Sequence, residues 1–170
     1  VAEAILRPPH PELFILEGEL ALLRGEESKA RGAFARAHDL RPHTSWPETL
    51  VHRYAEDSPD TVWLKGQAIE IKTAIEAGES SPEANIELAV VALGQGLKVE
   101  AMDALDAAIT AGYLDRAYLQ VSPLFKPLAD EPRFAAAIDR ISQNVARERA
   151  IVLAADWLPA DLLSAVKVSP

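Results

Sequence analysis

The apolar positions of this chain recur three and four residues apart, which is the spacing of one face of a helix. In the stretch 27–39, that face is formed by Ala30, Ala33, Phe34 and Ala37. Small residues on such a face let two helices approach closely. We therefore predict a helix over about 11–24, a turn at Gly25 and a second helix over about 27–39.

The same pattern returns 71 residues further along the chain. Placing residues 11–42 on residues 82–113 gives nine identical pairs in 32 positions. The pairs are Pro11/Pro82, Glu12/Glu83, Ile15/Ile86, Ala21/Ala92, Leu22/Leu93, Gly25/Gly96, Ala30/Ala101, Ala33/Ala104 and Ala37/Ala108. They fall at helix starts, packing positions and turns, where a repeated helical hairpin needs them. The alternative for the small-residue stripe, taken alone, is an amphipathic helix in a bundle without repeats.

Proline followed by an acidic residue marks four expected helix starts, at 11–12, 47–48, 59–60 and 82–83. Proline suits the first helical position, and a carboxylate in the first turn complements the positive end of the helix dipole. Ser58 and Ser81 directly precede two of these prolines and are expected to be N-caps. Between the two hairpins we expect a short helix over about 47–56 and a longer one over about 60–77.

The first hairpin resembles the tetratricopeptide pattern of an aromatic residue, a small pair, a small residue four positions before an aromatic, and a closing proline. The residues that carry the resemblance are Phe14, Gly18, Ala21, Ala30, Phe34 and Pro42. Glu17 stands where the pattern usually has Leu, and Ala21 where it usually has Tyr. The later hairpin is similar at Leu88, Ala89, Ala92, Ala101 and Leu105, but it lacks the opening aromatic and ends at Tyr113 instead of proline.

The resemblance implies an all-α, tetratricopeptide-like solenoid of helical hairpins with a C-terminal capping helix, in one domain over residues 1–170. Within it we expect a repeat at 11–42, a divergent repeat at 43–81, a repeat at 82–113 and a cap at 114–170. Leu6-Arg7-Pro8 recurs as Leu40-Arg41-Pro42, a shift of 34 residues, and a tetratricopeptide unit is about 34 residues long. Residues 1–8 are therefore expected to end a truncated repeat that follows an upstream domain of the same polypeptide.

The tail after Gly112 is punctuated by proline in the runs 123–128 and 132–134. It resembles a tail found after the last tetratricopeptide unit in bacterial multidomain signalling and regulatory proteins. We expect a helix over about 132–156, closed by Trp157-Leu158-Pro159, and a short helix over about 161–166. The expected role of the tail is to cover the last hairpin.

Composition narrows the classes of partner. The formal net charge of −9 disfavours nucleic acid, whose phosphates are bound mainly by Lys and Arg. The longest purely apolar runs are six residues, as in 88–93, and a membrane span needs about 20. There is no cysteine, which leaves the compartment open between the cytoplasm, which we favour, and the periplasm.

No set of residues indicates catalysis, a cofactor or a metal site. The four histidines, at 10, 38, 43 and 52, include no pair at the i, i+4 spacing of a helical metal site. The glycines at 94, 96 and 112 lack the strand and the Lys-Ser or Lys-Thr of a phosphate-binding loop. Asp103 and Asp106 are expected on a solvated face, and Trp46 and Trp63 as core or interface filling.

In tetratricopeptide proteins the first helix of each pair lines a concave surface, so the resemblance makes that surface the candidate site. The candidate partner-binding residues are Glu12, Ile15, Glu19 and Leu22 in the first hairpin, and Glu83, Ile86, Val90 and Leu93 in the second. This acidic and aliphatic set suits a protein segment with apolar anchors and basic flanks. The alternative is that neighbouring helices fill the surface.

We therefore expect a non-catalytic module that binds a peptide or protein segment. The alternative function is an accessory domain packed on the catalytic or DNA-binding domain of a bacterial signalling enzyme or transcriptional regulator, with no ligand of its own. A homodimer through exposed ends of the array stays open.

Overall fold

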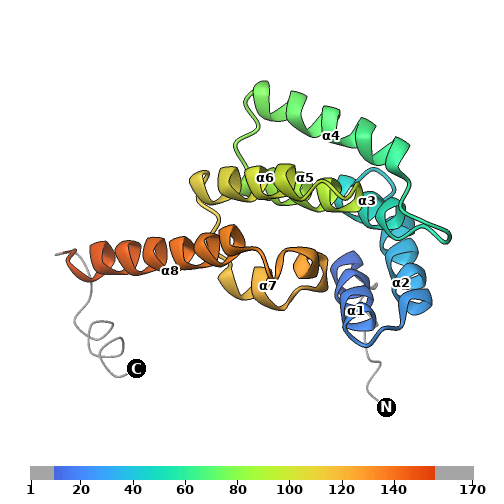
Figure 1. Ribbon diagram of the computed structural model, residues 1–170, viewed down its shortest axis with the longest axis horizontal. Helices are drawn as coiled ribbons and strands as arrows, with labels where there is room; N and C mark the ends of the chain where they lie inside the picture. Colours follow the sequence, from blue (N-terminus) through green and yellow to red (C-terminus); the bar gives the residue numbers. More distant parts are fainter. Residues whose placement is uncertain (1–9, 156–170) are drawn as a thin grey trace, which may run out of the picture.

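The computed structural model describes residues 10–155, and every regular element in that range is a helix (Figure 1). The elements are α1 (Pro11–Leu23), α2 (Glu27–Leu40), α3 (Ser45–Arg53), α4 (Thr61–Glu76), α5 (Pro82–Gly94), α6 (Lys98–Thr110), α7 (Arg116–Val121), the 3-10 helix η1 (Pro123–Leu128) and α8 (Pro132–Leu153). The described part of the chain is therefore all-α, as the sequence predicted.

The helical pairs α1–α2 and α5–α6 are built alike. Helices α1 and α5 have 13 residues each and begin and end 71 positions apart. Both pairs turn on a glycine with positive φ, 74° at Gly25 and 76° at Gly96, a conformation that costs glycine little. The turns also share their hydrogen bonds, since Glu26 N–H donates to the carbonyl of Ala21 and Leu97 N–H to that of Ala92. The repeated sequence therefore forms two copies of one local structure.

The predicted helix starts hold at Pro11 and Pro82 and shift at the other two prolines. Ser81 is the N-cap of α5, as predicted. Ser58 is not a cap; the carboxylate of Asp60 accepts the N–H of Trp63 at 3.0 Å and caps α4 instead. Helix α3 begins two residues before Pro47, at Ser45. An aspartate that can accept a first-turn N–H is as good a cap as serine, which explains the shift at α4.

The pair α3–α4 lies between the two similar hairpins along the chain but packs differently. Helix α3 packs on α2 and α5, and α4 packs on α5. A small apolar cluster of Leu64, Ile71 and Val91 joins α4 to α5, separate from the main core. Most of the remaining buried side chains belong to one large cluster that runs from α1 to α8.

The tail does more than cover the last hairpin. Helix α8 packs on α6 through Phe134, Ala137, Ile138 and Ile141, which are buried. Arg133 bridges from α8 to Asp103 at 2.7 Å and to Asp106 of α6, so these two aspartates pair across helices instead of facing solvent alone. The segment η1 folds back onto both α1 and α5. Trp157-Leu158-Pro159 and the short helix expected near 161–166 lie outside the described residues.

Candidate functional site

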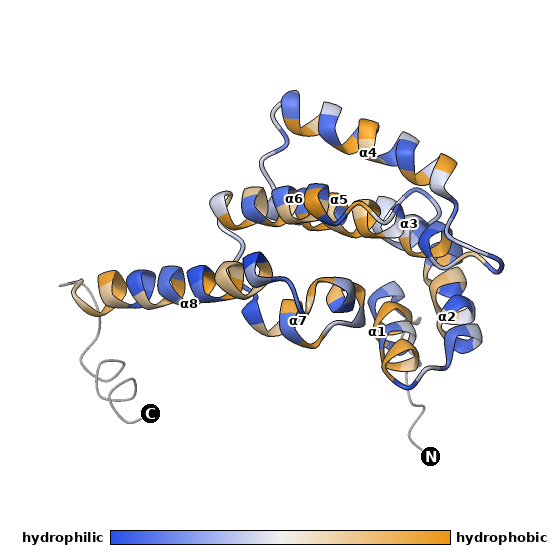
Figure 2. Cartoon of the chain, in the orientation of Figure 1, coloured by the Kyte–Doolittle hydropathy of each residue, from blue (hydrophilic) through white to orange (hydrophobic). Residues whose placement is uncertain are grey.

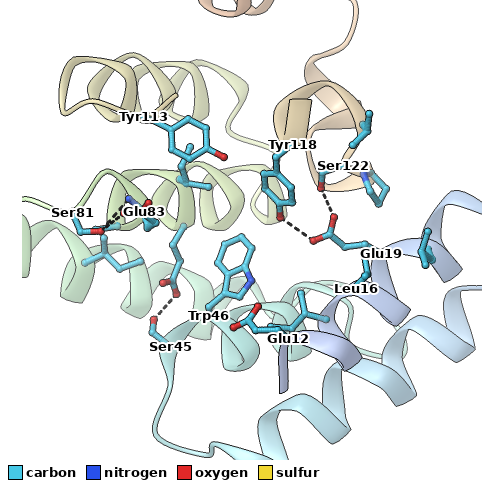
Figure 3. Close-up of a pocket in the computed structure, with 18 of the residues that line it drawn as sticks. Glu12, Leu16, Glu19, Ser45, Trp46, Ser81, Glu83, Tyr113, Tyr118 and Ser122 are labelled. Atoms are coloured by element: carbon cyan, nitrogen blue, oxygen red, sulfur yellow. Dashed lines mark hydrogen bonds between the residues drawn. The ribbon is translucent and has the colours of Figure 1, made fainter. Parts of the chain in front are cut away.

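A hollow of about 800 Å³ opens between α1, the start of α3, the C-terminal end of α4, the N-terminal end of α5, and α7 (Figure 3). Its lining is mainly aliphatic and aromatic, with carboxylates among the apolar groups. Trp46 lies among the lining residues while packing partly against the main core. Trp46 was expected to fill core or interface space; part of its surface packs on the core, and another part faces the hollow.

Five of the eight residues predicted for the concave surface line this one hollow. They are Glu12, Ile15 and Glu19 from α1, and Glu83 and Ile86 from α5. The fold thus brings together positions that are about 70 residues apart in the sequence.

The other three predicted residues do not line this hollow. Val90 is fully buried, Leu93 is buried apart from 8% of its surface, and Leu22 packs half-buried against the main core. The carbonyl of Val90 accepts a hydrogen bond from Arg53. These three side chains support the interior, and a charged substitution at Val90 would disturb the core before it tested binding.

The chain's own tail occupies the side of the surface next to the hollow. The Glu19 carboxylate is buried and accepts the hydroxyl of Tyr118 at 2.8 Å and that of Ser122 at 2.7 Å (Figure 3). Burial raises the pKa of Glu19 above its ordinary value, and the two hydroxyl donors partly oppose that rise. Beside these contacts, η1 inserts Leu124, Phe125 and Leu128, all almost fully buried.

Arg53, at the end of α3, holds η1 through hydrogen bonds to backbone carbonyls. Its guanidinium donates to the backbone carbonyl of Leu124 at 2.7 Å and to that of Val90 at 3.4 Å, and the side chain is buried. Burial lowers the pKa of Arg53. Because the pKa of an arginine side chain starts far above neutral pH, we treat the buried group as charged. One buried cation thereby joins the tail to α5.

Arg53, Tyr118 and Ser122 were not identified from the sequence. Arg53 ends a short helix and gives no local signal of burial. Ser122 precedes Pro123, the same Ser-Pro arrangement that marks the start of α5, and it does cap η1 by accepting the N–H of Leu124. That signal was readable, but nothing in the sequence indicates that the same hydroxyl also donates to Glu19.

The open part of the hollow carries negative charge. Glu12, Glu79 and Glu83 line it, and the lining residues within 10–155 include no Lys, Arg or His. The hydroxyl of Ser81 donates to Glu83 and lowers the pKa of that carboxyl, which favours its charged form. The carboxylate of Glu87 accepts hydrogen bonds from Ser45 and Thr49 of α3. The site therefore offers apolar surface beside an acidic rim.

Other polar groups serve local structure. His10 accepts the N–H of Glu12 at 3.3 Å and caps α1. The Nδ1 atom of His52 lies 3.1 Å from the Oδ2 atom of Asp60, and the His52 ring stacks on the ring of Trp63. These contacts close the loop between α3 and α4. Across residues 10–155, no group of three or more His, Cys, Asp or Glu is placed to hold a metal ion. Nor is any helix in that range both long and apolar enough to span a membrane.

No family model, no curated protein and no solved structure matches this chain. The tetratricopeptide resemblance accordingly rests on the residues quoted for it and stays a prediction.

Proposed function

We propose that this chain is a tetratricopeptide-like module that binds a segment of another protein in the hollow between α1 and α5, without catalysing a reaction. The observation that carries the proposal is the shared lining: matching positions of two like helices, Glu12 with Glu83 and Ile15 with Ile86, line one hollow of about 800 Å³. A concave surface with apolar walls and a few polar groups is typical of binding sites.

The tail supports the kind of ligand proposed. Residues 122–128 are a short stretch held on the same face by apolar side chains, by two bonds to Glu19 and Arg53, and by a cap. A surface that holds seven residues of its own chain in this way has the chemistry to hold a similar segment beside them. The acidic rim favours basic residues at the flanks of that segment.

The internal likeness of α1–α2 and α5–α6 supports the solenoid part of the proposal. Their turn hydrogen bonds are the same, α1 and α5 match in length, and α2 and α6 differ by one residue, which is what a repeated unit would give; in this proposal α3–α4 is a divergent unit between them. Two of the carboxylates that line the hollow, Glu19 and Glu87, are occupied by structural hydrogen bonds. This arrangement supports binding and gives no support to bond making.

One observation favours the alternative of an accessory domain packed on a neighbouring domain. The last turns of α8 reach past its contact with α6, and Val145, Ile151 and Val152 are exposed there. An exposed apolar end of a long helix is a surface that another domain would cover.

The experiment is selection of random peptides, displayed on phage, against the purified protein. We expect the selected peptides to combine aliphatic or aromatic residues with Lys or Arg. Glu12→Lys should weaken their binding about tenfold, because it reverses one charge on the rim.

Glu100→Lys is the matched control, since Glu100 is also a first-turn carboxylate, on α6, and does not line the hollow. Binding that both substitutions weaken equally, or a selection that enriches no common pattern, would contradict the proposal.

A further inference from the structure

The internal repeat shows how a face of α5 is covered. Ala84, Glu87, Val91 and Gly94 lie on that face. Val91 is fully buried in the cluster with Leu64 and Ile71 of α4. At Gly94 the fit is so close that an added Cβ would lie 2.7 Å from the Cδ1 atom of Leu64. Thr49 and Gln67 of α3 and α4 donate to Glu87. This face is therefore the docking surface for the preceding helical pair.

The matching face of α1 has no cover among the described residues. The 71-residue shift puts Leu13, Leu16, Leu20 and Leu23 on Ala84, Glu87, Val91 and Gly94. The four leucines are 62%, 56%, 42% and 58% exposed. Their spacing of three, four and three residues places them in one stripe along the helix, which we call the α1 leucine face. Figure 2 shows α1 as largely hydrophobic.

The α1 leucine face is continuous with the hollow. Leu16, Leu20 and Leu23 line it together with Val121 of α7, which is 65% exposed. A helix is apolar on several sides only when it is covered on several sides. Helix α1 is apolar both toward α2 and along this stripe, so we expect another helix or segment to cover the stripe.

The spacing of the leucines and the charge beside them indicate which kind of partner would bind the α1 leucine face. A stripe of leucines at helical spacing matches the ridges of another helix, as the apolar side of α4 matches α5 through Leu64, Ala68, Ile71 and Ile75.

The acidic residues Glu12, Glu79 and Glu83 beside the α1 leucine face favour Lys or Arg on that helix. A second copy of α1 would instead bring Glu12 and Glu17 toward this rim in a chain of net charge −9.

We propose that the α1 leucine face binds a basic amphipathic α-helix of a partner protein, which lies along α1 as α4 lies along α5. The inference rests on the proposed binding function and specifies its ligand: a helix with aliphatic residues at i, i+4, i+7 and i+11 and basic residues on its flanks.

The probe is a stapled helical peptide with the sequence of α4 in which Glu70 and Glu76 are replaced with Lys. Its binding to the full chain is measured by fluorescence anisotropy. We expect Leu20→Asp to weaken binding by about tenfold or more, since a central anchor contact carries a large share of the affinity. Val99→Asp, at an exposed apolar position of α6, should leave binding unchanged and is the matched control.

Three outcomes would overturn the inference. The first is no binding of the stapled helix at about millimolar concentration. The second is equal binding of an unstapled peptide that carries a proline at its centre, because that peptide cannot be helical. The third is a stable dimer in analytical ultracentrifugation that Leu20→Asp converts to monomer, since a second copy would then cover the face.

These outcomes are separable from failure of the proposed function. If the phage-selected peptides still depend on Glu12 while the stapled helix does not depend on Leu20, the hollow binds a segment but not a helix along α1. If neither depends on its residue, the binding function itself is wrong.

Discussion

The hairpins α1–α2 and α5–α6 have nearly the same helix lengths, the same turn hydrogen bonds and the same glycine geometry, and they differ in what surrounds them. Helix α5 lies between α4 and η1, with α6 behind it, and it is buried along most of its length. Helix α1 has α2 and η1 as neighbours, and its third side is the exposed α1 leucine face. Local sequence therefore fixes the hairpin, and the neighbours decide which of its faces is available for binding.

The two helices also differ on the face that meets the tail. Glu19 of α1 matches Val90 of α5, so one position is a buried carboxylate and the other a buried aliphatic side chain. Glu19 binds the tail through its side chain, and Val90 offers its backbone carbonyl to Arg53. The tail is thus held by a side-chain carboxylate on α1 and, through Arg53, by a backbone carbonyl on α5.

The largest expected effect separates the covered face from the open one. Val91→Asp should lower the free energy of unfolding by about 4 kcal/mol, because it places a carboxylate between Leu64 and Ile71 where Val91 is fully buried. The matching change Leu20→Asp should cost less than about 1 kcal/mol, since Leu20 stays 42% exposed. Urea denaturation followed by circular dichroism measures both values.

Similar losses at the two positions would contradict the comparison. They would mean that the α1 leucine face is already covered in solution, and a concentration-dependent loss at Leu20 would identify another copy of the chain as the cover.

A second prediction concerns how each hairpin fills the space between its helices. Gly18 packs against Phe34, and an added Cβ at Gly18 would lie 2.3 Å from the Phe34 ring. The matching pair in α5–α6 is Ala89 with Leu105. The second hairpin therefore has a larger residue than glycine on its first helix and a smaller residue than phenylalanine on its second. Gly18→Ala should therefore destabilise the protein by about 2 kcal/mol, because overpacking outweighs the better helix propensity of alanine.

Phe34→Leu is the compensating change and copies the second hairpin. Alone it should cost about 1 kcal/mol through the space it leaves, and together with Gly18→Ala it should bring the free energy of unfolding within about 1 kcal/mol of the original protein. If the two losses simply add in the thermal or urea unfolding of the double variant, the hairpins do not share one packing scheme.

The sequence was sufficient for the hairpins because their signals are local. Prolines at 11 and 82, glycines at 25 and 96, and the small-residue stripes each act within a few residues. The fold-back of η1 was not predictable in this way, because it depends on Arg53, which lies 71 residues before its partner carbonyl at Leu124. Five of the candidate site residues were placed together by the repeat.

The exposure of α1 could not be foreseen from its residues either. Leu20 and Val91 are both aliphatic and occupy the same position in the repeat, so pattern alone assigns them one environment. Only the position of α4 distinguishes them. Likewise, the tetratricopeptide resemblance places Val90 and Leu93 on an open concave face, and it is Arg53 and η1 that enclose them.

The smallest expected effect is a change in the pH dependence of stability, and it tests how Glu19 holds the tail. Burial raises the pKa of Glu19 in the folded state above the unfolded value of 4.5. The folded state therefore binds this proton more tightly, so the stability from this group is complete below pH 4.5 and is lost as the pH rises through the folded pKa.

Glu19→Gln removes that titration while keeping an amide oxygen that can accept the hydroxyl of Tyr118. At pH 7 the lost charged hydrogen bonds and the relieved burial of charge oppose each other, and we expect a change in the free energy of unfolding below about 1 kcal/mol. Urea denaturation between about pH 4 and pH 8 should show the variant gaining on the original protein as the pH rises. Glu100→Gln, an exposed site on α6, should show no such trend. A variant that instead loses ground as the pH rises would mean that the folded state favours the ionised Glu19, and that Tyr118 and Ser122 outweigh its burial.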